Sequence, residues 1–143
     1  MSAAVRFEHA HDLPTVLARH DRAADVQAHE LAVRAPLAGL VLQSTFSCMP
    51  DIGGELFPWL PVKWLCTIKY DTCKKLPRLK LPVLIMHSHN DGLIGFHHAT
   101  KNFSVANEPK LLWELPGEHN DPVGDPDHFL AGFEKFLTMI EAR

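Results

Sequence analysis

The sequence predicts an α/β protein with about four parallel strands and flanking helices. Several short apolar runs carry no alternation of polar residues, which suits strands buried on both faces of a parallel sheet. Stretches with helical spacing lie between these runs, and alternating strands and helices are typical of parallel sheets joined by crossovers. The chain has 143 residues, a length that fits one domain around a single core.

The predicted strands are residues 15–19, 37–43, 82–87 and 110–115. The first has the weakest pattern, and the other three are short, mostly apolar runs without alternation. We expect residues 1–14 to form a flexible or irregular N-terminus, because they contain no apolar run. They also lack the apolar core of a signal peptide or membrane anchor.

Three helices are expected between and after the strands. An Ala-rich stretch over residues 23–35 ends at Pro36, which cannot continue a helix. Residues 96–106 place apolar side chains on one face. The last helix begins near Asp125, a plausible N-cap, with Pro126 in its first turn. Its apolar face is expected to contain Phe129, Phe133, Phe136 or Leu137, and Ile140.

The long segment between the second and third of these runs, residues 48–80, is rich in aromatic residues and includes Trp59 and Trp64. It is either a helix packed on the edge of the sheet or a lid that forms an acyl-binding wall.

Composition narrows the function classes. Apolar residues make up 46% and charged residues 22%, and the net charge is −3 with neutral His. No run of Lys or Arg stands out, so nucleic acid is not an expected partner. The 3 cysteines are odd in number and lack metal-site spacing, which indicates reduced thiols in the cytoplasm.

Polar residues follow the predicted strands at the edge where open α/β sheets bind ligands. Asp91 follows the third strand, and His119 follows the fourth, 28 residues later. A Ser-His-Asp hydrolase needs such a pair, since the carboxylate orients the His that takes the proton of the nucleophile. The alternative for Asp91 is a turn residue before Gly92, without a catalytic role. The alternative for His119 is an exposed imidazole in a loop.

A metal site is a further interpretation of the same stretch. His87, His89 and Asp91 form an H-x-H-x-D pattern, and His with carboxylate suits zinc. The metal-dependent β-lactamase-like hydrolases carry H-x-H-x-D-H, whereas Gly92 follows Asp91 here. We therefore expect no metal and no cofactor.

Several stretches together resemble a known family. These are PLAGLVLQSTFS, FPWLPVKWL, YDTCKKLPRLKLPVLIMHSHNDGLIGFHHATKNF and EPKLLWELPGEHND. From residue 36 to about residue 137 the chain resembles the C-terminal half of an α/β-hydrolase of the BEM46-like group, which includes the mammalian α/β-hydrolase-domain proteins 12, 13 and 17. The resemblance implies that Asp91 is the acid and His119 the base of a catalytic triad. It gives His87 and His89 no role.

The nucleophile of that family is missing from its usual place. The G-x-S-x-G motif would fall at HDRAA, residues 20–24, where Arg22 replaces the serine. The chain is then a hydrolase that has lost catalysis, one with a relocated nucleophile, or a fragment completed by another chain. Ser44 is the best candidate for relocation, with Ser47 and Cys48 as substitutes; the alternative is that Ser44 only caps the following backbone.

The predicted function is hydrolysis of short acyl esters by Asp91, His119 and Ser44. Phe46, Trp59 and Trp64 are expected to contact the substrate. The alternative is a catalytically inactive homodimer that binds a small apolar ligand in the same pocket. Both interpretations include a homo-oligomer, because residues 15–19 are expected to present an open strand edge, which can pair with a second copy.

Overall fold

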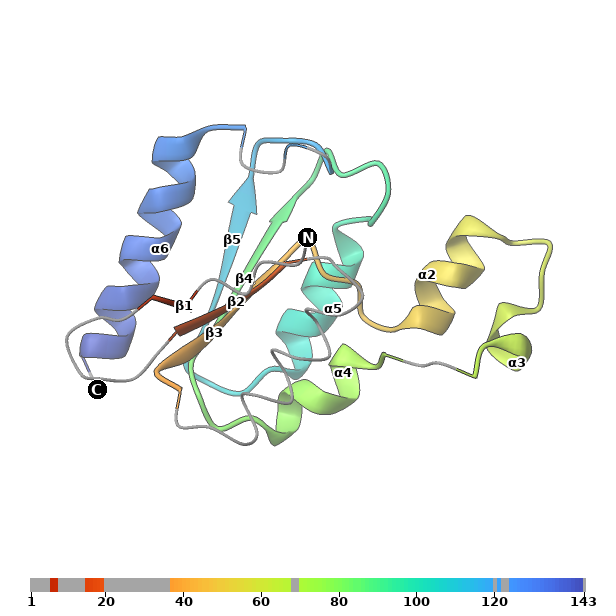
Figure 1. The fold of residues 1–143 in the computed structure, drawn as a ribbon, viewed down its shortest axis with the longest axis horizontal. Coiled ribbons are helices and arrows are strands. Elements are labelled where there is room, and N and C mark those ends of the chain that lie inside the picture. Colours follow the sequence, from red (N-terminus) through yellow and green to blue (C-terminus); the bar gives the residue numbers. More distant parts are fainter. Residues whose placement is uncertain are drawn as a thin grey trace.

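The computed structural model describes residues 6–7, 15–19, 37–67, 70–119, 121 and 124–142, and it describes the backbone alone for the first two ranges. These residues form a five-stranded sheet in the order β1-β2-β3-β4-β5 (Figure 1). The strands are β1 (Arg6–Phe7), β2 (Thr15–Arg19), β3 (Gly39–Gln43), β4 (Val83–Ser88) and β5 (Lys110–Leu115). Strands β2 to β5 are parallel, which confirms the predicted fold class and the four predicted strands.

The short strand β1 is a correction to the prediction. It pairs antiparallel with the edge of β2 that was expected to be open, with Arg6 opposite Val16 and Phe7 opposite Thr15. It also lies within residues 1–14, which were expected to be irregular. Two residues leave no readable periodicity in a sequence, yet their backbone groups still satisfy part of an exposed strand edge.

The two central strands are buried on both faces, as their continuous apolar runs predict. On one face, Leu40 and Ile85 pack in a cluster with Ala99 of α5 (His97–Val105). On the other face, Val41 and Leu84 pack in a second cluster around Phe136. Figure 1 shows the corresponding layers, with α6 on one side of the sheet and α4 and α5 on the other.

The helix α6 (Pro126–Glu141) begins where the sequence predicts. The Asp125 side chain accepts hydrogen bonds from the backbone N–H groups of Asp127 and His128, so it caps the first turn. The apolar face predicted for this helix packs against the sheet through Phe129, Phe133, Phe136 and Ile140. The helix predicted over residues 23–35 lies outside the described residues.

The segment between β3 and β4 forms short helices. These are α2 (Met49–Leu56), α3 (Val62–Leu65), α4 (Thr72–Lys75) and a 3₁₀ turn, η1 (Leu76–Arg78). Helices α2 and α3 extend away from the sheet (Figure 1). Among the described helices, none is long and apolar enough to cross a membrane.

Candidate active site

Asp91 and His119 meet at the carboxyl end of β4 and β5. The Nδ1 atom of His119 lies 2.8 Å from Oδ2 and 3.0 Å from Oδ1 of Asp91. The Asp91 side chain is fully buried, whereas the His119 side chain is 18% exposed. The carboxylate thus contacts the Nδ1 edge of the His119 ring, and Nε2 lies on the other edge of the ring.

The two loops that carry this pair are tied together by polar contacts. The Ser88 hydroxyl at the end of β4 donates to the carbonyl of Gly117. The Asn90 side-chain amide donates to the carbonyl of Pro116 over 3.2 Å, and the Asn90 backbone N–H donates to Ser88 Oγ over 3.0 Å. Because β4 and β5 are adjacent and parallel, these contacts hold the loop of Asp91 against the loop of His119.

The Asp91 carboxylate is kept ionised by its surroundings. Burial alone would raise its pKa, but donors to the carboxylate outweigh burial and hold the pKa of Asp91 below its usual value. These donors are the backbone N–H of Ile94 at 2.7 Å, the His119 ring, and the backbone N–H of Leu93 at 2.9 Å. An ionised carboxylate on Nδ1 favours the tautomer in which Nδ1 carries the proton and Nε2 can accept one.

His87 supports the same loop, a role that sequence reasoning missed. Its buried ring donates from Nε2 to the carbonyl of Ile94 over 2.7 Å, and Nε2 lies 3.5 Å from Asp91 Oδ2. Burial lowers the pKa of His87, so the ring is held neutral. The sequence did contain one indication of this role: His87 ends an apolar strand, and a buried His needs a hydrogen-bond partner.

The H-x-H-x-D stretch does not gather as a metal site. The His89 ring stacks on Phe96 with 3.6 Å between ring centroids, and its Nε2 lies 3.4 Å from Oε1 of Glu114. His87, two residues earlier, points into the interior instead. The imidazoles of His87 and His89 therefore lie in different surroundings, one buried and one on the surface.

Ser44 lies directly after β3, next to the strand that precedes Asp91. Its φ is 52°, in the left-handed region that residues other than Gly seldom adopt. It is 2% exposed, and its hydroxyl has no hydrogen-bond partner in the described part of the chain. The structure therefore does not join Ser44 to His119 by a hydrogen bond.

The substitute nucleophiles lie in a different environment. The Ser47 hydroxyl is fully buried and lies 2.9 Å from Nδ1 of His98. Burial raises the pKa of the Cys48 thiol, which lowers the fraction of reactive thiolate. The Cys48 thiol is therefore poorly ionised, and the Ser47 hydroxyl is hydrogen-bonded to His98 and Asp51.

The aromatic residues predicted to contact substrate separate into two groups. Phe46 is buried and packs with Ile52 and Ile94. Trp59 is 77% exposed and Trp64 is 91% exposed, on the segment that extends from the sheet. The residues 20–24 that stand at the family's nucleophile position lie outside the described part of the chain.

Comparison of the whole chain with known proteins identifies its fold. No protein-family model matches the chain. The chain is similar in structure to an esterase from Pyrococcus furiosus, with a TM-score of 0.63 and 16% identity over 87% of this chain and 52% of that one. It is likewise similar to an esterase domain from Rhodothermus marinus, with a TM-score of 0.61 and 14% identity over 87% of this chain and 59% of that one. The chain has part of an α/β-hydrolase fold.

Of two curated relatives, one agrees with this α/β-hydrolase assignment in name, and both are longer than this chain. The chain is 33% identical over 110 residues to an uncharacterized protein of Mycobacterium tuberculosis, covering 76% of this chain and 39% of the relative. It is 32% identical over 117 residues to the alpha/beta hydrolase domain-containing protein aho-3 of Caenorhabditis elegans, covering 80% of this chain and 33% of the relative. The chain thus spans between a third and two fifths of these relatives, which confirms the resemblance to a partial α/β-hydrolase.

The order of Asp91 and His119 along the chain fits this α/β-hydrolase fold. In such enzymes the acid precedes the His in sequence, after the nucleophile. Ser44, Asp91 and His119 follow that order, and each lies after a strand of the parallel sheet.

Proposed function

We propose that the chain hydrolyses carboxylic esters with short acyl groups, using His119 as general base and Asp91 as the acid that orients it. The observation that supports this is the contact between His119 Nδ1 and both oxygens of a buried, ionised Asp91. The fold, shared with esterases of known structure, agrees with a hydrolase.

Ser44 is the proposed nucleophile. Three features support this role: its left-handed backbone at a strand end, its hydroxyl without a partner among the described residues, and its place beside β4. Nucleophiles of this fold also sit on a strained turn after a strand. Because Ser44 is buried, the proposal requires that its surroundings open to admit an ester.

The reaction then has two stages. His119 Nε2 takes the proton of the Ser44 hydroxyl as Oγ bonds to the ester carbonyl carbon, and the proton passes to the departing alcohol as the carbon–oxygen bond breaks. Water next attacks the acyl–serine, gives a proton to His119, and releases the carboxylic acid while the proton returns to Ser44 Oγ. Asp91 stays ionised throughout and stabilises the imidazolium that forms in each stage.

A set of matched variants tests this proposal. Hydrolysis of p-nitrophenyl acetate and butyrate is measured for the parent chain and for His119→Ala, Asp91→Asn, Ser44→Ala and His89→Ala. We expect kcat/KM to fall by about 100-fold or more for His119→Ala, because a general base is lost. His89→Ala is the control, since it removes an exposed imidazole outside the Asp91 contact.

Covalent labelling separates a serine nucleophile from imidazole-assisted attack by water. A fluorophosphonate probe should add to Ser44 in the parent chain and fail to add in His119→Ala, as located by peptide mass spectrometry. Hydrolysis that requires His119 but survives Ser44→Ala would remove Ser44 from the mechanism. Equal hydrolysis by all variants, or none by the parent, would refute the esterase and favour the inactive ligand-binding homodimer.

A further inference from the structure

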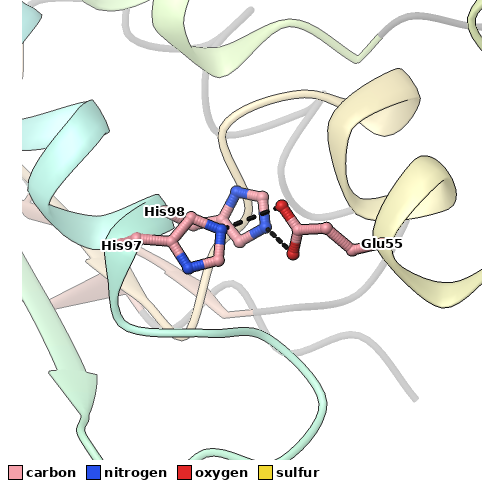
Figure 2. A group of neighbouring side chains, drawn as sticks. All are labelled: Glu55, His97 and His98. Carbon is pink, nitrogen blue, oxygen red and sulfur yellow. Dashed lines mark hydrogen bonds and ion pairs between the residues drawn. The ribbon is translucent and has the colours of Figure 1, made fainter. Parts of the chain in front are cut away.

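A second group of polar side chains, made of residues other than Asp91 and His119, lies between α2 and α5. Glu55 comes from the last turn of α2, and His97 and His98 begin α5. Figure 2 shows the two rings and the carboxylate pointing toward one another. His97 Nε2 lies 2.9 Å from Glu55 Oε1, and His98 Nε2 lies 3.1 Å from Glu55 Oε2.

The spacing of these atoms is close to that of a coordination sphere. One ligand atom from each residue lies within 4.8 Å of the others. Bonds of roughly 2.0–2.1 Å to a tetrahedral zinc ion place its ligand atoms about 3.3 Å apart. Protons bridge these nitrogens and oxygens in the absence of metal, and an ion between them would replace those protons with small shifts of the side chains.

His98 is held in place by contacts behind its ring. It is 1% exposed, and its Nδ1 lies 2.9 Å from the Ser47 hydroxyl, which lies 3.2 Å from Oδ2 of Asp51. A hydrogen bond to the second ring nitrogen is the usual support of a metal-binding His. Coordination through Nε2 puts the ring proton on Nδ1, which then donates to Ser47 Oγ. The competing 3.2 Å contact from the Ser47 backbone N–H is given up.

The His97 ring lies close to the backbone of the glycine two residues before it. A Cβ built at Gly95 would lie 2.6 Å from Nδ1 of His97, so a side chain there would displace the ring. The ring is 60% exposed and the Glu55 side chain 43% exposed, which leaves one side of the group open to water.

We propose that Glu55, His97 and His98 bind a divalent transition-metal ion, zinc foremost, which joins α2 to α5. Two imidazoles and one carboxylate form a donor set that zinc accepts, with water in the open fourth position. The residues come from segments more than 40 positions apart, so the ion would fasten the extended α2 segment to the helical layer of the sheet. This site is independent of the proposed esterase activity.

Calorimetric titration with zinc chloride tests the site on the whole chain. We expect saturable binding of one zinc ion that is weakened on the order of 100-fold in His97→Ala and in Glu55→Gln. Both residues are exposed, so these variants keep the fold, which circular dichroism checks. His89→Ala is the matched control, because His89 and Glu114 form an imidazole–carboxylate pair that lacks a third ligand.

Two further measurements connect binding to this geometry. Cobalt(II) should give the visible absorption of a four-coordinate ion in the parent chain and lose it in His97→Ala. Zinc should raise the melting temperature of the parent and of His89→Ala, and leave that of His97→Ala unchanged. Binding that is equally tight in His97→Ala and Glu55→Gln, or no saturable binding in the parent, would overturn the proposal.

Discussion

At the scale of single residues, Asp91 shows how a charge is kept inside the protein. Its carboxylate accepts from two backbone N–H groups and from the His119 ring, and these donors outweigh the effect of burial. A carboxylate with a lowered pKa in the folded state stabilises the fold when it is ionised.

The first prediction follows from the sign of that shift. The unfolded pKa of Asp is about 3.9 and the folded pKa of Asp91 is lower. The stabilisation is therefore complete above the unfolded value and is lost as the pH falls through the folded one. Urea unfolding from pH 7 to pH 3 should show a smaller loss of stability toward acid in Asp91→Asn than in the parent. Parallel pH profiles for the two proteins would contradict this.

The second prediction concerns Ser44. Its buried hydroxyl has no hydrogen-bond partner in the described residues, and such a group costs about 1–3 kcal/mol. Ser44→Ala removes the hydroxyl and keeps the backbone angle, so the free energy of unfolding should rise by about 1 kcal/mol. Denaturant midpoints measure this, and Ser47→Ala is the opposite case, because its hydroxyl is bonded. A loss of stability in Ser44→Ala would mean that its hydroxyl has a partner.

At the scale of elements, α6 depends on its cap and on one close approach to the sheet. Asp125 Oδ1 accepts from two backbone N–H groups at 3.0 and 3.1 Å. A Cβ at Gly132 would lie 2.5 Å from Cδ1 of Trp113, so the helix meets the sheet at a residue without a side chain.

Removing the cap is the third prediction. Asp125→Ala should lower the free energy of unfolding by about 1 kcal/mol, because two N–H groups at the helix start lose their acceptor. Asp127→Ala is the control, since it removes a charge from the same turn but not the cap. Equal losses in the two variants would show that charge near the helix start matters more than the cap.

The fourth prediction uses Gly132 to weigh two opposing effects. Ala is a better helix former than Gly by about 1 kcal/mol, whereas forcing atoms into a filled contact costs about 1–3 kcal/mol. The Trp113 ring is held by its hydrogen bond to the carbonyl of His128, so it cannot easily move away. Gly132→Ala should therefore lower the melting temperature; a rise would show that the ring yields.

The elements differ in how well sequence could predict them. Strands β3, β4 and β5 are nearly continuous apolar runs, and α6 has both a cap and a helical apolar spacing, so local patterns were sufficient. Strand β1 is too short to have a pattern. The exposure of Trp59 and Trp64 was not predictable, because it depends on how far α2 and α3 extend from the sheet.

The contact between Asp91 and His119 was predictable from the sequence, whereas their catalytic role stays a proposal. Asp91 and His119 were paired because parallel strands bring their carboxyl ends to one edge, a rule that needs only strand order. Glu55 and the His97–His98 pair were missed, because their approach depends on how α2 packs on α5 and no spacing encodes it. The sequence indicated only that two adjacent His residues, His97 and His98, stand at the start of a predicted helix.

At the scale of the whole molecule, the outer edge of β2 is covered over part of its length. Strand β1 pairs with Thr15 and Val16, and within the described chain residues 17–19 pair on the β3 side only. A partly open edge still favours pairing with another chain.

The fifth prediction is therefore self-association through this edge. Light scattering at micromolar concentration should give the mass of a homodimer, and replacing Leu17 by Pro should shift it toward the monomer, because Pro removes a backbone donor. Circular dichroism checks that the variant is folded, and Leu130→Ser, on an exposed side of α6, is the control. A monomer at all concentrations would contradict the prediction.

The strand order has a consequence for how the chain folds. Each strand of the sheet lies beside the one that precedes it in sequence, from β1 to β5. Among the described strands, each can therefore add to the strand that precedes it, so the sheet can grow in the order of the chain. Long crossovers separate the parallel strands, such as residues 44–82 between β3 and β4, so each pairing closes a large loop and forms more slowly than a hairpin. A chain with part of an α/β-hydrolase fold can therefore pair its described strands among themselves, without a strand from the rest of that fold.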